Sequence, residues 1–201
     1  MANNLYIKAK ASTTSISTAT LMKTGQTTSY RTGDDGNIQS GRATNFNTLS
    51  TNNPFGNTNR FTDELGGSTY ANNIMIDWST YNGSNVLGYK RTYESNNLWN
   101  ASIDGCLTIS IGTFTSGWRM WNIREFLNIC NFSQVDTNPF PTPFSTPNTY
   151  IWTSNTNNTD TTQAYMVALE NQITYRRFPK TGASLPTVAV RNFTVTGTTL
   201  S

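Results

Sequence analysis

Residues 117–132 constrain the fold most, because they combine a helical hydrophobic period with two tryptophans near their start. In the second half of this stretch, apolar side chains recur at i, i+3, i+4 and i+7, as on one face of a helix. Asn122 precedes this stripe and Glu125 follows three residues later, which is the pattern of an N-cap with a capping box. The sequence therefore predicts a short helix over residues 122–131. Its apolar stripe consists of Ile123, Phe126, Leu127 and Cys130.

Trp118 and Trp121 stand just before this helix. A buried indole contributes a large apolar area, and its N–H usually needs an acceptor. We therefore expect both rings to anchor the helix, and we interpret Arg119 and Glu125 as a structural pair at the same site. The residues expected to have structural roles are Trp99, Trp118, Arg119, Asn122 and Glu125.

Neutral polar residues dominate the composition. Charged residues make up only 12% of the 201 residues, which is about half the usual share. Asn, Thr and Ser alternate with many short apolar runs, a pattern that favours turn-rich β structure. The composition therefore predicts turn-rich β structure rather than a helix bundle. The 12% of aromatic residues supply enough core to argue against disorder.

Alternating apolar residues predict several strands. Residues 73–78 and 86–93 are expected to pair as a hairpin, because the Asn82-Gly83 step between them is a strong turn signal. Residues 97–110 change to a helical period and predict the earlier helix. Its stripe consists of Leu98, Trp99, Ser102, Ile103, Cys106 and Leu107. Further strands are expected at residues 150–154, 164–169, 173–178 and 187–194.

We expect one domain over residues 21–201, preceded by an extended arm over residues 1–20. Extended chains offer edges for pairing, so the arm is interpreted as an attachment or oligomerisation segment. An edge strand of the same domain is the alternative. Four prolines between residues 139 and 147 predict an ordered loop without regular structure.

The sequence contains few residues of the types that serve in catalysis or metal binding. The chain contains no histidine, which removes the commonest general base and metal ligand. Cys106 and Cys130 are interpreted as two buried free thiols. The adjacent acids Asp34 and Asp35 lie in a glycine-rich run, which favours a turn over a calcium site. We therefore predict no enzymatic activity, no metal and no cofactor.

The charge distribution argues against nucleic acid as a partner. The formal net charge is +3, and the basic residues occur as scattered pairs rather than as a stripe. No run approaches the roughly 20 apolar residues of a membrane span. The N-terminus lacks a signal-peptide core, so we expect synthesis in the cytoplasm and no export by a recognisable signal. A particle such as a virion would still carry the protein out of the cell.

The best candidate for ligand binding is the polar loop at residues 152–162, together with the strand that leads into it. Asn side chains both donate and accept hydrogen bonds, as sugar hydroxyls require, and an aromatic ring stacks on the apolar face of a sugar. The alternative is that Trp152 belongs to the core and the loop is merely solvated. The candidate residues are Tyr150, Trp152, Ser154, Asn155, Asn157, Asn158 and Asp160.

Several motifs, in a fixed order, resemble the Lcl C-terminal domain family, named after collagen-like bacterial adhesins. The order includes Lys23-Thr-Gly and Arg60-Phe-Thr-Asp63, and later Tyr150-Ile-Trp-Thr-Ser154. Gly117-Trp118-Arg119, followed by Asn122 and the run Arg124-Glu125-Phe126, is similar to the family's Trp-Arg-Leu-Pro-Asn and Arg-Glu-Leu signature. The resemblance covers most of the chain. Trp121 departs from it, because the family usually has Pro there.

The resemblance implies an α+β domain with a C-type-lectin-like fold, in which two helices flank small, mostly antiparallel sheets and long loops carry recognition. Members of this family recognise carbohydrates or proteins at surfaces, in bacterial adhesins and in phage virion proteins. The Glu-Pro-Asn and Trp-Asn-Asp motifs of calcium-dependent sugar-binding lectins are not present in this sequence, which disfavours calcium-dependent recognition.

The resulting hypothesis is a phage virion surface protein, such as a capsid decoration, a head fibre or a tail adhesin. We expect it to bind a host-surface or mucosal glycan, or a host-surface protein. We also expect residues 1–20 to attach it to other virion proteins, and the oligomer to be a homotrimer. The alternatives are a capsid or tail cement protein without a ligand, and a bacterial surface adhesin.

Overall fold

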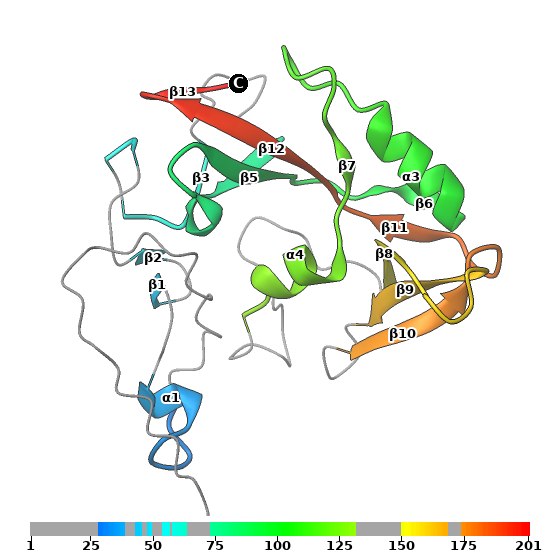
Figure 1. Ribbon diagram of the computed structural model, residues 1–201, viewed down its shortest axis with the longest axis horizontal. Helices are drawn as coiled ribbons and strands as arrows, with labels where there is room; N and C mark the ends of the chain where they lie inside the picture. The colour runs from blue at the N-terminus through cyan, green and yellow to red at the C-terminus, as the bar shows by residue number, and fades with distance from the viewer. Residues whose placement is uncertain are drawn as a thin grey trace, which may run out of the picture.

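The computed structural model describes residues 28–38, 43–45, 48–49, 54–56, 58–63, 73–131, 150–168 and 174–201. The predicted arm at residues 1–20, the proline-rich loop at 139–147 and the turn at 170–172 lie outside the described residues. Within the described ranges the protein is mostly β, with few helices and curled antiparallel sheets (Figure 1). This architecture is compatible with the predicted α+β class.

The largest sheet has the order β13-β12-β5-β4-β3, with β7 paired to β12. The hairpin predicted around the Asn82-Gly83 step is confirmed as the antiparallel pair of β4 and β5, with Ile76 opposite Gly88. The strands are β3 Phe61–Thr62, β4 Ile74–Asp77, β5 Asn85–Lys90, β7 Arg119–Met120, β12 Ala189–Thr196 and β13 Thr199–Leu200.

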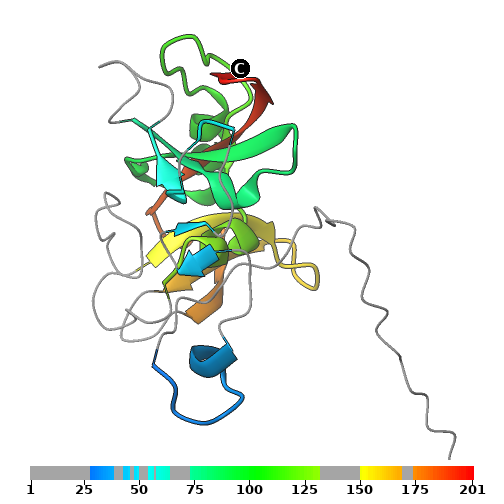
Figure 2. The same cartoon turned by 90° about the vertical axis from the view of Figure 1, so that its left-hand side faces the viewer.

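A three-stranded sheet has the order β10-β9-β8. Figure 2 shows the large sheet above and this smaller sheet below it. Two further strand pairs are β11 with β6 and β1 with β2. The strands are β1 Ala43–Asn45, β2 Thr48–Leu49, β6 Glu94–Asn97, β8 Tyr150–Thr156, β9 Gln163–Ala168, β10 Thr174–Pro179 and β11 Leu185–Thr187.

The strand predicted at residues 187–194 is two strands, because β11 and β12 belong to different sheets. The chain changes partner at Val188, whose carbonyl accepts a hydrogen bond from the Trp121 N–H at 3.0 Å. β11 pairs with β6, whereas β12 pairs with β5 and β7. At Val188 the chain therefore passes from the β11–β6 pair into the large sheet.

The helices are α1 Asp35–Ile38, the 3-10 turn η1 Trp78–Thr80, α3 Trp99–Leu107 and α4 Ile123–Asn128. The earlier predicted helix is therefore confirmed in a shorter form. Its expected stripe is partly wrong, because Leu98 and Leu107 are 42% and 56% exposed. Leu98 is the N-cap rather than a helical residue, and Leu107 lies about 100° around the helix from Cys106.

Helix α4 begins as predicted. The Asn122 side chain accepts from the backbone N–H of Arg124 and of Glu125, and the Glu125 carboxylate accepts from the Asn122 N–H at 2.8 Å. Glu125 also forms the expected pair with the Arg119 guanidinium. The stripe prediction is wrong at Leu127, which is exposed, while Ile129 is buried. Because α4 ends at Asn128, the helical period no longer decides which later side chains face the core.

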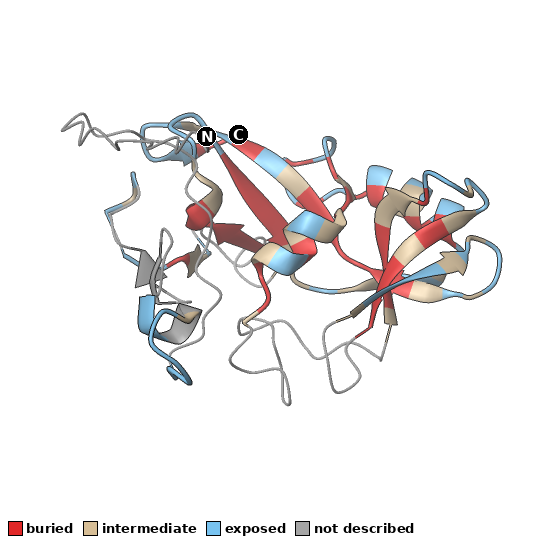
Figure 3. Ribbon diagram, turned by 60° about the horizontal axis from the view of Figure 1, so that its bottom comes forward, coloured by how far each residue is buried: buried red, intermediate tan, exposed pale blue. Residues whose placement is uncertain are grey.

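All five tryptophans are buried, and each indole N–H donates a hydrogen bond. Trp118 donates to the Phe114 carbonyl at 3.0 Å, which confirms its expected core role. Trp121 donates to the Trp152 carbonyl at 2.8 Å, and its own carbonyl accepts from the Ser154 N–H. Trp121 therefore links the start of α4 to β8. Figure 3 shows the buried positions along the strands of both sheets. No described helix has the length and apolarity that a membrane span requires.

Candidate functional site

Trp152 is a core residue and not a surface platform for a ligand. Its side chain is fully buried, and its indole N–H donates to the Asn97 carbonyl at 3.1 Å. The ring also lies 6.4 Å from the Phe178 ring. Of the two roles that the sequence left open for Trp152, the structure supports the core role.

Three of the predicted binding residues hold the backbone instead of facing outward. Asn155 Oδ1 accepts the Ile123 N–H at 2.8 Å, at the start of α4. Asn157 is buried, and its Oδ1 accepts from both the N–H and the hydroxyl of Thr159. The Asp160 carboxylate accepts from the Thr162 hydroxyl and N–H, which lower its pKa. These side chains shape the turn between β8 and β9, since Asn and Asp readily form such local bonds.

The remaining three candidates are more accessible. Asn158 is exposed on the turn, and Ser154 and Tyr150 are half-buried on β8. The Tyr150 ring lies 5.8 Å from the Arg176 guanidinium, which is within cation–π range. The predicted residues are therefore not gathered at one place, and of these three only Asn158 lines the depression described next.

An open depression of about 560 Å³ lies against one face of the β8–β10 sheet. Arg177 on β10 pairs with Tyr165 on β9, so both side chains are on the same face of the sheet. Tyr175, two residues earlier, shares this face and is 64% exposed. The Tyr165 and Tyr175 rings are 6.1 Å apart at an interplanar angle of 63°. The lining residues are Asn157, Asn158, Thr159, Tyr165, Tyr175, Arg176 and Arg177.

The turn over this depression is held by an irregularity in β8. The register between β8 and β9 shifts between Trp152 and Thr156, so β8 bulges before the turn. Within the bulge, the buried Thr153 hydroxyl donates to the Tyr165 carbonyl at 2.8 Å. Asn157 and Thr159 are thereby placed beside the tyrosine pair.

Sequence reasoning missed Tyr165, Tyr175 and Arg177. They belong to the predicted strands at 164–169 and 173–178, which we interpreted only as structure. The available signal was that Tyr175 and Arg177 occupy alternate positions of the predicted strand, with the charged Arg176 between them. The strand register was needed to bring Tyr165 to the same face.

A second depression, of about 390 Å³, lies beside β5. Most of its polar groups already have partners within the protein. The Thr80 hydroxyl donates to the Asp77 carbonyl and accepts from the Leu87 N–H, and the Asn82 side-chain oxygen accepts from two backbone N–H groups. Glu125, also in the lining, is paired with Arg119. This depression therefore offers fewer free groups to a ligand than the first.

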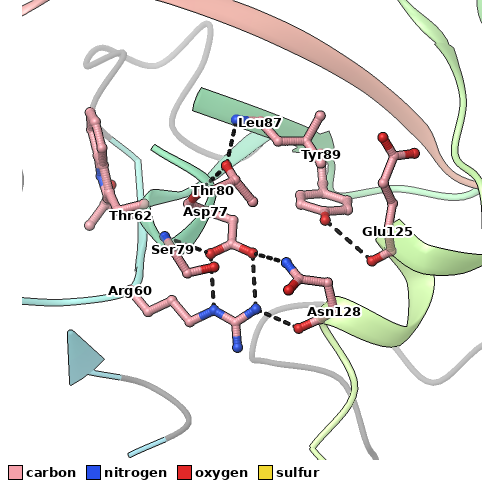
Figure 4. A network of polar contacts seen from close by, with 10 residues as sticks. Arg60, Thr62, Asp77, Ser79, Thr80, Leu87, Tyr89, Glu125 and Asn128 are labelled. Carbon is pink, nitrogen blue, oxygen red and sulfur yellow. Dashed lines mark hydrogen bonds and ion pairs between the residues drawn. The ribbon is translucent and has the colours of Figure 1, made fainter. Parts of the chain in front are cut away.

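A buried polar network connects β4 to α4 (Figure 4). The carboxylate of Asp77 accepts two hydrogen bonds from the Arg60 guanidinium, at 2.9 and 3.0 Å, and both side chains are fully buried. Asn128 Nδ2 donates to Asp77 at 2.9 Å, and the Asn128 carbonyl accepts from Arg60. Because these groups are shielded from solvent and satisfy one another, the network is suited to holding α4 against the sheet.

The two cysteines are free and buried, in agreement with the sequence interpretation. Burial raises the pKa of the Cys106 thiol to about 12 and raises that of Cys130 further. Both thiols are thus protonated at neutral pH, which disfavours a nucleophilic role.

The turn predicted around Asp34 is confirmed. Its carboxylate accepts from the backbone N–H groups of Tyr30, Arg31 and Asn37, and these hydrogen bonds lower its pKa. Within the described ranges, no group of three or more potential metal ligands comes together.

No protein-family model, no curated protein and no solved structure matches this chain. The resemblance to the Lcl C-terminal domains, and the lectin-like fold that it implies, therefore remain predictions.

Proposed function

We propose that this protein is a non-enzymatic recognition protein with a C-type-lectin-like domain, which binds a glycan in the depression on the β8–β10 sheet. The observation that carries this proposal is the pair of tyrosine rings formed by the half-buried Tyr165 and the exposed Tyr175, beside the amide of Asn158. Aromatic faces pack against the C–H faces of sugars, and amides and hydroxyls exchange hydrogen bonds with sugar hydroxyls.

The shape of the depression also favours a saccharide. It is open and lined by polar and aromatic groups, whereas small apolar ligands prefer enclosed, mainly apolar pockets. The turn over it is held by hydrogen bonds that the Asn157 and Asp160 side chains accept from the backbone N–H groups of Thr159 and Thr162. A site that is already ordered loses less conformational entropy on binding.

We further propose that the protein is displayed on a phage virion, as a capsid decoration, head fibre or tail adhesin, and forms a homotrimer. This part of the proposal is supported by the resemblance of residues 23–191 to the Lcl C-terminal domains and by the sparse charge. Residues 1–20 would attach the protein to other virion proteins. A chain lacking residues 1–20 is expected to lose attachment to particles but to keep glycan binding. Unchanged particle attachment would contradict this role of the arm.

A glycan array probed with the full chain tests the binding function. We expect binding to a subset of glycans and a roughly two- to tenfold loss on Tyr175→Ala, because a well-packed aromatic contact contributes about 0.5–1.5 kcal/mol. Tyr30→Ala is the matched control, since Tyr30 is 83% exposed on the turn before α1. Binding that is equally weakened by both substitutions, or by neither, would contradict the proposed site.

A further inference from the structure

The arginines of the described chain differ in how their charge is balanced. Three of them are neutralised by a carboxylate of the protein itself. These pairs are Arg60 with Asp77, Arg91 with Asp63 and Arg119 with Glu125. A fourth, Arg191, lies over the rings of Phe114 and Phe193 and donates to the Ser116 carbonyl.

Arg177 differs from all four. It is exposed on β10, and within the part of the chain that the structure describes it has no carboxylate within ion-pair distance. Figure 3 shows the outer strand β10 as largely exposed. A guanidinium keeps its charge at every physiological pH and carries five N–H donors without an acceptor. Arg177 therefore leaves an unbalanced positive group at the depression.

The strand register determines on which face of the sheet the Arg177 charge lies. Arg177 lies opposite Tyr165 and on the same face as Tyr175. The neighbouring Arg176 also borders the depression, but its guanidinium contacts the Tyr150 ring and hydroxyl. No acidic residue lines the depression, and the nearby Asp160 carboxylate accepts from Thr162.

We propose that the saccharide bound in this depression carries a carboxylate, as uronic and sialic acids do, and that Arg177 binds this carboxylate. The inference rests on the proposed glycan-binding function and specifies its ligand class. The planar fork of a guanidinium matches a carboxylate in a bidentate pair. The two tyrosine rings at the base of the same face receive the apolar side of the sugar ring.

Two other anionic ligands fit the structure less well. A densely sulfated polymer requires an extended positive surface. The depression is lined by only two arginines, of which Arg176 contacts Tyr150, and the whole chain has a net charge of only +3. An acidic peptide usually needs an apolar pocket for an anchoring side chain. The lining is polar and aromatic instead.

Calorimetric titration of the full chain tests the proposal. The probes are a galacturonate oligosaccharide, its methyl ester, a neutral oligosaccharide of equal length, sialyllactose, dextran sulfate and a polyglutamate peptide. We expect at least one carboxylated saccharide to bind, with at least tenfold higher affinity than its uncharged counterpart. Charge-assisted hydrogen bonds are strong enough to give such a difference. Raising the salt concentration should reduce this difference.

Arg177→Gln should abolish the preference for the carboxylated probe, and Arg177→Lys should restore only part of it, because an ammonium lacks the bidentate fork. Arg124→Gln is the matched control, since Arg124 is exposed on α4 and does not line the depression. Its affinity for every probe should equal that of the unmodified chain.

The outcomes separate this inference from the function on which it rests. If the galacturonate and its methyl ester bind with equal affinity, and Tyr175→Ala weakens the binding of both, then the proposed carboxylate recognition is wrong. The proposed glycan binding would stand. Binding of dextran sulfate or polyglutamate alone would also overturn the proposal. Failure of every saccharide probe to bind would contradict both the inference and the proposed function.

Discussion

At the scale of single residues, Gly88 shows how closely the large sheet is packed. A Cβ at this position on β5 would collide with the Phe193 ring and lie 3.1 Å from Ile76 Cδ1. Phe193 and Ile76 are both fully buried, so neither side chain moves easily. Gly105 on α3 has open space around it and an ordinary backbone conformation.

Gly88→Ala and Gly105→Ala should therefore change stability in opposite directions. We expect Gly88→Ala to lower the free energy of unfolding by about 1–3 kcal/mol, as overpacked cores do. Gly105→Ala should raise it by about 0.5–1 kcal/mol, because alanine favours the helix. Urea denaturation of both variants measures these changes. A neutral Gly88→Ala variant would contradict the packing described here.

The ion pair between Arg60 and Asp77 is also argued from single residues. Asp77→Asn leaves the buried Arg60 charge without its partner, so we expect a loss of about 3–5 kcal/mol in the free energy of unfolding. Asp63→Asn removes the partner of Arg91 at a carboxylate that is 40% exposed, and it should cost less than about 1 kcal/mol. Similar losses in the two variants, measured by thermal and urea unfolding, would show that burial does not set the cost.

At the scale of elements, local sequence signals predicted the structure best. The Asn122–Glu125 capping box and the Asn82-Gly83 hairpin each involve residues close in sequence, and both are present. The Arg60–Asp77 pair spans 17 residues, and the contact of Asp77 with Asn128 spans 51. No local period reveals such contacts, because they depend on how the strands and α4 come together.

The candidate site likewise depends on contacts that local sequence signals do not reveal. The aromatic and polar character of residues 150–178 was visible in the sequence, but the grouping of Tyr165, Tyr175 and Arg177 depends on strand register. The bulge in β8 also turned Asn155 toward α4, where it accepts the Ile123 N–H. Residue type alone could not distinguish such a structural Asn from the exposed Asn158.

The N-cap of α4 gives a prediction for this element. Asn122→Ala removes the acceptor for the N–H groups of Arg124 and Glu125, and it should lower the free energy of unfolding by about 1 kcal/mol. Asn158→Ala, at an exposed position of the β8–β9 turn, should change it by less than about 0.5 kcal/mol. Chemical denaturation followed by tryptophan fluorescence compares the two. Equal effects would contradict the capping role.

At the scale of the whole molecule, alkaline pH should destabilise the fold. Burial raises the pKa of Tyr89, Tyr93, Cys106 and Cys130 above their ordinary values of 10.0 and 9.0. The folded state keeps these groups protonated, whereas the unfolded chain releases their protons at the ordinary values. The stability that these four groups contribute is therefore fully present below about pH 9. As the pH rises further, the free energy of unfolding falls by up to about 1.4 kcal/mol per pH unit for each group.

Urea unfolding at about pH 8.5, 9.5 and 10.5, which together span the ordinary pKa values of Cys and Tyr at about 8.5 and 10, measures this decline. Tyr93→Phe should make the decline shallower, because one of the four groups no longer titrates. A free energy of unfolding that stays constant across this pH range would contradict the burial of these groups.

The central claim is that the face carrying Tyr165, Tyr175 and Arg177 contacts the ligand. Amide chemical-shift mapping of the full chain with the tightest-binding saccharide tests it most directly. We predict that the largest shifts fall on residues 157–159, 165 and 175–177. Shifts concentrated instead on residues 80–87 and 192, around the second depression, would contradict the claim.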